Sequence, residues 1–256
     1  MSIMSISTVA VAPLEPPRRG ARLPDIGAPA PARNFTIRTA ASGPERDHAA
    51  QLLRDRYAWR GYRTVQLPAD QTGYRTTLSA HEGEATIGTL TLEMDGPQRL
   101  SADNAFGDVT EAMRAAGARL TEFTRLAVDP GGSSPRVLAA LFHVGYIVAH
   151  RIRRYDTLLL EVNPRHARFY ERMLGCRIVG DERTHPGVGA PAVLLSARFD
   201  FIRDQIRAYG GRPEDASNAR SLYPFAFSKQ DEEGILARLV AAQFPDAAAV
   251  PEDALN

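Results

Sequence analysis

Residues 120–135 read LTEFTRLAVDPGGSSP and residues 157–175 read TLLLEVNPRHARFYERMLG, and these two stretches decide the fold. The first begins as an apolar strand pattern and stops at a proline-glycine turn. The second begins as a continuous apolar run, typical of a strand covered on both faces. It continues as a helix that opens with Pro164 and ends at Gly175. Residues 135–153 lie between the two stretches and are apolar on most faces, which predicts a largely buried helix.

Strands and helices are also predicted before and after these two stretches of the sequence. A capping box at 42–45, with proline in the first turn, starts a helix that runs to about residue 59. The second half of 100–118 is also expected to be helical. Further strands are expected at 35–38, 74–81, 86–93, 176–179 and 192–198, with a turn at 81–84. This order predicts an α/β fold, with one layered sheet and a helix on each side.

The two ends of the chain differ in composition from the centre. Residues 1–33 contain six prolines among Ala and Arg and no periodic apolar pattern, so they are expected to form a flexible arm. Residues 34–199 are expected to form the α/β domain. Residues 200–256 are expected to form a helical C-terminal appendage, with one helix at 201–209 and another that begins at Ser228 or Asp231.

The composition excludes several classes of protein. The net charge of +1 gives no reason to expect a nucleic-acid or membrane partner. Cys176, the only cysteine, fits a reducing compartment, and no apolar run approaches the ~18 residues that span a bilayer. No basic residues precede the mildly apolar start, so a cytoplasmic location is expected. Lys229 is the only lysine and lies in a polar tail, which argues against Walker-type phosphate loops and Schiff-base chemistry.

Two opposite charges interrupt the apolar strand pattern at 120–128. In a regular strand, Glu122 would share one face with Thr124, and Arg125 would share the other face with Phe123. Burying either charge is costly unless it is paired. The functional interpretation makes Glu122 a general base, directly or through water, and Arg125 an anchor for a carboxylate or phosphate. A structural ion pair at an edge of the sheet is an equally supported alternative.

The turn at 129–134 leads from this strand into the buried helix. Gly131 and Gly132 would let an anion approach the backbone N–H groups of a helix start, which makes them candidate cofactor-binding residues. A plain turn is the alternative for two glycines after a strand.

Tyr170 lies about two turns into the helix that follows Asn163. A tyrosine hydroxyl can donate a proton to a leaving thiolate, and a core aromatic is the alternative. His143 and His150 share a helix face, but no cysteine or carboxylate joins them at ligand spacing, so no metal site is expected.

The helix at 164–174 carries a resemblance to a known superfamily. Asn163, Ala167, Tyr170 and Gly175 supply the pattern N-x-x-A-x-x-x-Y-x-x-x-G-F of the GNAT acyltransferases, with small spacing differences. The chain therefore resembles that superfamily. The resemblance implies a single mixed sheet whose central strands splay apart into a cleft that admits a pantetheine arm. It also places Tyr170 in the general-acid position.

Glu122-x-x-Arg125 is similar to the motif of two GNAT-related groups, the acyl-homoserine lactone synthases and the N-acyl amino acid synthases. Segments 164–170 and 189–195 look like the second group, and the similarity runs from about residue 35 to 198. The superfamily's Q/R-x-x-G-x-G/A loop should lie near 130–136, where the glycines occur without that spacing. The resemblance therefore implies acyl carrier protein, rather than coenzyme A, as the donor.

These resemblances imply an N-acyltransferase that moves a fatty acyl chain from acyl carrier protein to the α-amine of an amino acid or another small amine. Glu122 would deprotonate the amine, and Tyr170 would protonate the departing thiol. The backbone from Leu126 to Val128 would stabilise the oxyanion. Arg125 would hold the acceptor carboxylate or the neighbouring backbone. Asn163 would lie on the thioester side.

Neither a tightly bound cofactor nor a nucleic-acid partner is expected. Two alternatives stay open: an N-acetyltransferase that uses acyl-CoA, and a catalytically inactive GNAT-like module. Such a module would bind lipid or protein through its cleft and its arginine-rich surface.

Overall fold

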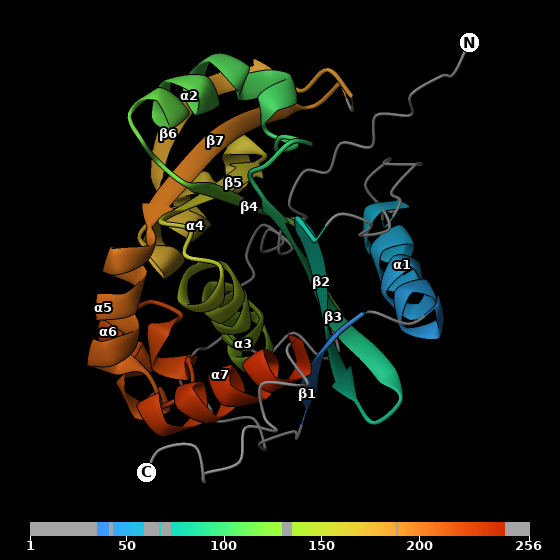
Figure 1. Ribbon diagram of the computed structural model, residues 1–256, viewed down its shortest axis with the longest axis vertical. Coiled ribbons are helices and arrows are strands. Elements are labelled where there is room, and N and C mark those ends of the chain that lie inside the picture. The colour runs from blue at the N-terminus through green and yellow to red at the C-terminus, as the bar shows by residue number, and fades with distance from the viewer. Residues whose placement is uncertain are drawn as a thin grey trace, which may run out of the picture.

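The computed structural model describes residues 35–40, 43–58, 67, 73–129, 135–187 and 189–243. Within these residues, one seven-stranded sheet has the order β1-β2-β3-β4-β5-β7-β6 (Figure 1). All neighbouring strands are antiparallel except β4 and β5, which are parallel. The predicted α/β fold with one mixed sheet is therefore confirmed. The strands are β1 (Thr36–Thr39), β2 (Arg75–Glu82), β3 (Ala85–Met94), β4 (Leu120–Val128), β5 (Thr157–Val162), β6 (Arg177–Thr184) and β7 (Pro191–Arg198).

The two parallel strands separate shortly after they meet. β4 pairs with β5 over three residues, and the last pair is Glu122 with Leu159. β4 nevertheless continues to Val128 and β5 to Val162. β3 stays paired with β4, and β7 stays paired with β5, so each half of the sheet stays intact. The sheet opens between β4 and β5 beyond Glu122, as the resemblance implied.

Helices cover both faces of this sheet (Figure 1). On one face, Tyr57 packs against Ala127, and Phe106 packs with Leu120 and Leu159. The other face carries the main core, which includes Leu141. None of the described helices is long and apolar enough to cross a membrane. The first face carries α1 (Gly43–Ala58) and α2 (Asp103–Ala115), and the second carries α3 (Pro135–Tyr146), its π-helical continuation η1 (Ile147–Ile152) and α4 (Pro164–Leu174).

The segment after β7 packs against α3 and η1. Its apolar side chains, among them Ile202 and Leu222, belong to the main core cluster. On α7, Glu232 lies 3.2 Å from Nε2 of His143 and also pairs with Arg151, so this helix is tied to both α3 and η1. The expected helical appendage is therefore present. It contains α5 (Phe199–Tyr209), η2 (Pro213–Asp215), α6 (Ala216–Ala219), η3 (Tyr223–Phe225) and α7 (Lys229–Gln243).

Some elements differ from the sequence prediction. β6 was expected at 176–179 but continues to Thr184. Its residues are exposed on both faces, with a single buried position at Gly180, so it has no apolar alternation to detect. The turn between β2 and β3 is Gly83-Glu84, shorter than predicted. The boundaries of the three segments stay predictions, and the arm at 1–33, Asn34, Ser42, and everything after Gln243 lie outside the described residues.

Candidate active site

Two carboxyl groups meet on one face of the sheet where β4 and β5 begin to separate. Glu93 of β3 and Glu122 of β4 are register partners, so their side chains share a face. Both are buried, with exposed fractions of 3% and 0%. Two carboxylates this close in a buried site disfavour each other's charge, which pushes their pKa values apart.

Glu93 is the charged member of this pair. Its Oε1 accepts a hydrogen bond from Arg125 Nη1 at 2.6 Å and lies 3.2 Å from Arg75 Nε. Its Oε2 accepts from the Ser101 hydroxyl at 2.7 Å and from the Ser101 amide at 3.2 Å. Burial opposes the charge, but the two guanidinium groups and these hydrogen bonds hold the pKa of Glu93 below its ordinary value.

Glu122 has a different environment. Its Oε2 accepts one hydrogen bond, from the Ala102 amide at 2.8 Å. Its Oε1 is buried and has no hydrogen-bond partner among the described residues. Burial raises the pKa of Glu122 well above its ordinary value, and the charges of Glu93 and Glu161 raise it further. The charged form of Glu122 is therefore disfavoured, whereas that of Glu93 is favoured.

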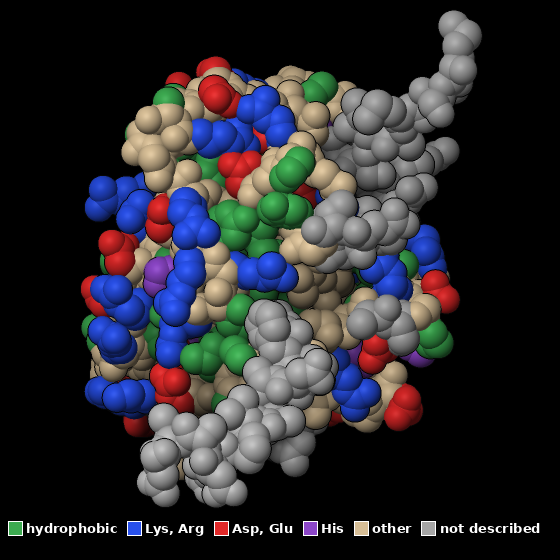
Figure 2. Space-filling model, in the orientation of Figure 1, with side chains coloured by type: hydrophobic (Ala, Val, Ile, Leu, Met, Phe, Trp, Pro, Cys, Tyr) green, Lys and Arg blue, Asp and Glu red, His purple; other side chains and the backbone are tan. Residues whose placement is uncertain are grey.

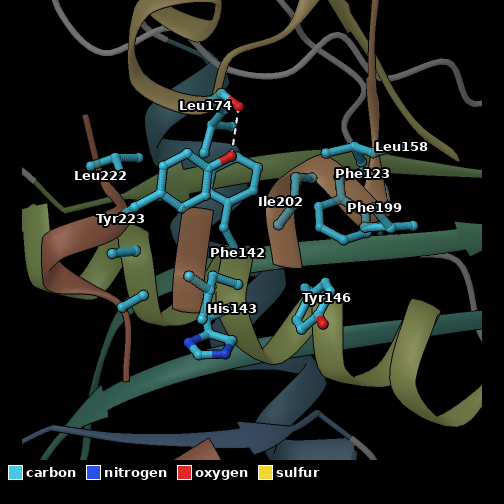
Figure 3. Close-up of a pocket in the computed structure, with 13 residues that line it drawn as sticks. Phe123, Phe142, His143, Tyr146, Leu158, Leu174, Phe199, Ile202, Leu222 and Tyr223 are labelled. Carbon is cyan, nitrogen blue, oxygen red and sulfur yellow. Dashed lines mark hydrogen bonds between the residues drawn. The ribbon is translucent and has the colours of Figure 1, made fainter. Parts of the chain in front are cut away.

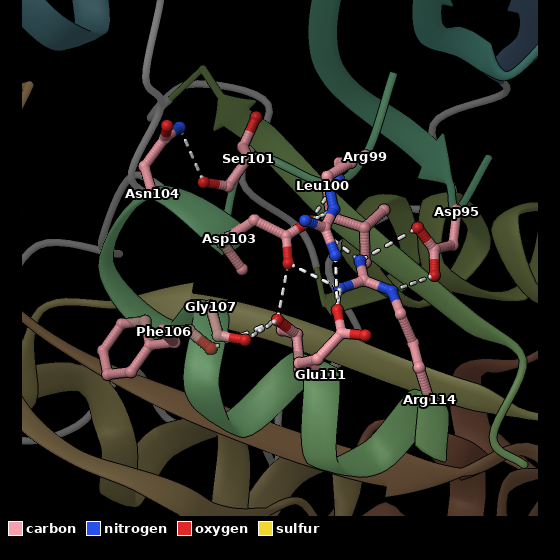
Figure 4. Close-up of polar contacts among 12 residues, drawn as sticks. Asp95, Arg99, Leu100, Ser101, Asp103, Asn104, Phe106, Gly107, Glu111 and Arg114 are labelled. Carbon is pink, nitrogen blue, oxygen red and sulfur yellow. Dashed lines mark hydrogen bonds and ion pairs between the residues drawn. The ribbon is translucent and has the colours of Figure 1, made fainter. Parts of the chain in front are cut away.

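A network of ion pairs holds the start of α2, which supplies the amide that binds Glu122 (Figure 4). Arg114 Nε lies 2.6 Å from Asp95, and its two terminal nitrogens bind Asp103 at 2.7 and 2.8 Å. Asp103 also accepts from the Leu100 amide at 2.8 Å. Burial opposes the charge of Asp103, but Arg114 keeps its pKa below the ordinary value. The network fixes the turn that contains Ala102.

Arg125 lies in a bulge of β4. The register with β3 shifts here, so that Arg125 and Leu126 together oppose one residue of β3. Arg125 has a φ of 50°, a rare conformation for a non-glycine residue, and its carbonyl accepts from Thr89 Oγ1 at 3.1 Å. The expectation that Arg125 shares a face with Phe123 was wrong. The bulge breaks the alternation, and the guanidinium reaches Glu93 on the opposite face.

α4 approaches the split from the other face of the sheet. Asn163 is its N-cap and accepts a hydrogen bond from the Arg165 amide at 3.2 Å, with Pro164 in the first turn. Tyr170 lies on the buried side of the helix and is 1% exposed. Gly175, with a φ of 71°, ends the helix in the left-handed conformation that glycine adopts without strain.

An apolar pocket lies on the same face as α4 (Figure 3). Its empty volume, open mouth included, is about 390 Å³. One wall comes from β4, β5 and α3, and the other from the appendage. The ring of Phe142 packs against Phe123 at 5.9 Å and meets the edge of Tyr170 at 6.5 Å. At the far side, the Tyr223 hydroxyl donates to the Leu174 carbonyl at 2.6 Å. The side chains that line the pocket are therefore apolar, and Phe142 joins them to Tyr170.

A buried acid-histidine pair was missed at the sequence level. Glu161 of β5 is fully buried, and Nε2 of His185 lies 3.6 Å from its Oε1. The signal for Glu161 was present, because a carboxylate interrupts the apolar run at 157–162 as Glu122 interrupts its own strand. His185 gave no signal, since it follows an exposed edge strand and reaches Glu161 only in the folded sheet.

The structure places the predicted residues on two elements. Arg125 joins the buried carboxyl cluster of Glu93 and Glu122 on β3 and β4, and Tyr170 lies on α4, which begins at Asn163, on the opposite face of the sheet. Leu126 lies in the bulge of β4, and Val128 lies beyond it. The predicted cofactor-binding residues Gly131 and Gly132 lie outside the described residues. No group of three or more metal-binding side chains occurs in the part of the chain that the structure describes.

Comparisons with known proteins identify relatives of this arrangement. Residues 48–198 match the family model described as N-acyl amino acid synthase FeeM. The solved structure of FeeM, an N-acyl amino acid synthase from uncultured soil microbes, is 26% identical with a TM-score of 0.59. The similarity covers 68% of this chain and 96% of that chain. A search of curated proteins found no match.

Two further solved structures were found at lower identity. A putative N-acetyltransferase from Lactobacillus plantarum is 16% identical, with a TM-score of 0.48 over 64% of this chain and 98% of that chain. The AHL synthase LasI is 15% identical, with a TM-score of 0.49 over 66% of this chain and 91% of that chain.

Proposed function

The chain belongs to the family of the N-acyl amino acid synthase FeeM, and from this premise we propose that it transfers a fatty acyl group from acyl carrier protein to the α-amine of an amino acid. The family makes it an acyltransferase; the donor and the acceptor are the proposed part. The observation that carries the proposal is Glu122, a buried carboxyl with one unpartnered oxygen at the point where β4 and β5 separate. A proton acceptor at this point can serve an amine that attacks a carbonyl held between the strands.

Glu122 is the proposed general base. The acceptor nitrogen attacks the thioester carbonyl carbon, a C–N bond forms, and Glu122 takes a proton from that nitrogen. Burial raises the pKa of Glu122, so its carboxylate is a stronger base than that of an exposed glutamate. Arg125 binds Glu93 through an ion pair and so compensates the charge of Glu93 beside Glu122.

The other half of the reaction takes place on the thioester side. Backbone N–H groups between Leu126 and Val128, beyond the bulge, would stabilise the tetrahedral oxyanion. As the C–S bond breaks, Tyr170 gives its phenolic proton to the departing sulfur. Asn163 caps the start of α4, the helix that carries Tyr170, and we place it on the thioester side of the split.

The apolar pocket supports a fatty acyl donor. Its lining residue Phe142 meets the ring of Tyr170, and its walls present aromatic and aliphatic side chains suited to a methylene chain. A chain that starts at a thioester carbonyl in the split can therefore continue into this pocket.

Arginine side chains support a carrier protein with an acidic surface. Figure 2 shows Lys and Arg side chains gathered along the side of the molecule that carries α5. Arg168 and Arg172 are exposed on α4, and Arg207 is exposed on α5. Gly131 and Gly132 would contact the phosphate of the pantetheine arm. The buried free thiol of Cys176 fits the cytoplasmic location that we propose.

Expression in a bacterial host tests this function. Lipid extracts analysed by mass spectrometry are expected to contain N-acyl amino acids when the wild-type chain is expressed. They should be absent with Glu122→Gln, which keeps the size of the side chain, and present with Glu171→Gln, which changes an exposed carboxyl on α4. A Glu122→Gln protein that accumulates the same lipids would remove Glu122 from the mechanism. Thermal protection by coenzyme A alone would favour the acyl-CoA donor instead.

A further inference from the structure

Glu161 lies on the same face of the sheet as Glu122. Glu122 pairs with Leu159 across the parallel strands, and Glu161 follows two residues later, so alternation returns it to that face. The charge of Glu161 raises the pKa of Glu122, so the two carboxyls lie close enough to interact. Glu161 also lies beyond the last β4–β5 pair, within the part of the sheet that has opened.

The surroundings of Glu161 do not explain it as a structural residue. Both carboxyl oxygens are buried and have no hydrogen-bond partner among the described residues. The register partner of Glu161 on β7 is Leu194, which is apolar. A buried carboxyl without hydrogen bonds destabilises a fold, and such groups in native proteins call for a ligand or a catalytic explanation.

His185 is oriented toward Glu161. The Gly187 amide donates to His185 Nδ1 at 2.9 Å, so the neutral ring carries its proton on Nε2. That nitrogen lies 3.6 Å from Glu161 Oε1. The distance is longer than a hydrogen bond, and a small movement on ionisation of Glu161 would form one. His185 can thus stabilise the carboxylate form of Glu161.

The chemistry of amide formation requires two proton acceptors. An amine acceptor in water is mainly an ammonium ion, with three N–H bonds, whereas the amide product keeps one. Two protons must therefore leave the nitrogen. Glu122 can take one, and Tyr170 is a proton donor in the proposed reaction. The proposed function therefore leaves one proton without an acceptor.

We propose that Glu161, positioned by His185, is this second acceptor: it takes the first proton from the acceptor's ammonium group. The neutral amine then attacks the thioester carbonyl and passes its second proton to Glu122 as the C–N bond forms and the C–S bond breaks. Tyr170 protonates the departing sulfur. When the products leave, Glu122 and Glu161 release their protons to water and Tyr170 regains one. This inference rests on the proposed function, because it requires an amine acceptor.

The charges around Glu161 agree with this role. Glu122 faces it from β4, His185 from the turn after β6, and Glu93 on β3 is balanced by Arg125. Burial raises the pKa of Glu161 to about 8. The carboxylate of Glu161 is therefore a stronger base than that of an ordinary glutamate, which favours proton transfer from the ammonium group. The arriving ammonium group lowers the pKa of Glu161, so the carboxyl releases its own proton to water and is ionised before it accepts one.

The test is a set of pH profiles of kcat/KM for N-acyl product formation by the full chain, with acyl carrier protein thioester as donor. The acceptors are the amino acid that the wild type acylates fastest and the amide of that amino acid, whose ammonium group is more acidic. Glu161→Gln is expected to lower kcat/KM by about 100-fold at neutral pH. The deficit should shrink as pH rises above about 8, where wild-type Glu161 is already ionised, and should be smaller with the amide, because more of the acceptor then arrives as neutral amine.

Three further variants complete the experiment. Glu122→Gln should lose activity with both acceptors at every pH, and His185→Gln should show a smaller deficit with the same pH trend as Glu161→Gln. Glu182→Gln, an exposed carboxyl on β6, should match the wild type. A Glu161→Gln deficit that is absent, or equal at every pH and for both acceptors, would overturn the inference alone. A wild-type protein that acylates no amine would instead overturn the proposed function and, with it, the need for a second acceptor.

Discussion

Glu122 and Glu161 destabilise the fold that contains them. Both are buried, both have oxygen atoms without hydrogen-bond partners among the described residues, and burial raises the pKa of both. Glu93, on the same face, differs because Arg125 and Ser101 satisfy its oxygens. Groups that lower stability are expected to persist where catalysis needs them.

Glu161→Gln is expected to stabilise the folded protein at neutral pH. Burial raises the pKa of Glu161 from 4.5 to about 8, so the folded protein keeps a proton that the unfolded chain releases. Relative to an uncharged side chain, Glu161 therefore lowers the free energy of unfolding progressively as pH rises from 4.5 to about 8. At neutral pH the gain from the uncharged amide should be about 3 kcal/mol. Urea unfolding of both proteins at about pH 4.5 and about pH 7 measures it. An equal difference at the two pH values would contradict the account.

The charged residues of the site were only partly predictable. Glu122 and Arg125 stand out because two charges interrupt an apolar strand. The pairing of Arg125 with Glu93 was not predictable, since it depends on a bulge that reverses the side-chain alternation. Glu161 and His185 lie on segments that meet only when β5, β7 and β6 assemble in that order.

Among the elements, β4, β5 and α4 agree with the sequence prediction at both ends. Their signals are local: apolar runs end at turn residues, and α4 has an Asn163 cap, a proline start and a glycine stop. β6 does not agree, because an exposed edge strand has no buried face to impose a period. The split between β4 and β5 has no local signal and came from the family resemblance alone.

Asn163 offers a test at the scale of the helix. Asn163→Ala removes the side chain that accepts from the Arg165 amide and should lower the free energy of unfolding by about 1 kcal/mol. Asn163→Ser also caps a helix and should retain wild-type stability. Thermal unfolding of both variants measures how much the cap contributes to stability. If Asn163→Ser keeps stability but loses acyl transfer, the amide contacts substrate; full activity in that variant would remove Asn163 from the substrate site.

At the scale of the whole molecule, the appendage completes the apolar pocket. Ile202, Ile206 and Leu222 form its outer wall, and they follow the 48–198 segment that matches the family. The sequence predicted helices here but not their contacts, because amphipathic helices do not specify which surface they cover. The acyl preference of this chain should therefore depend on residues beyond the family segment.

Ala226→Leu tests this dependence. Ala226 lines the pocket and is buried, so a larger side chain should shorten the space for the acyl chain and shift the preferred donor toward shorter chains. Overpacking should also cost about 1–3 kcal/mol of stability. Competition among acyl carrier protein thioesters of different chain length, read by mass spectrometry, measures the preference. Ala208→Leu, at an exposed position of α5, is the matched control. An unchanged preference in Ala226→Leu would place the acyl chain elsewhere.

The central claim is that Glu122, a buried carboxyl at the β4–β5 split, is the general base for acyl transfer to an amine. It is tested most directly with purified protein, a fatty acyl thioester of acyl carrier protein and a mixture of amino acids, followed by mass spectrometry of the products. The account predicts N-acyl amino acids from the wild type and formation at least about 100-fold slower from Glu122→Gln. Conversion of the thioester to free fatty acid alone, or an unchanged rate in Glu122→Gln, would contradict it.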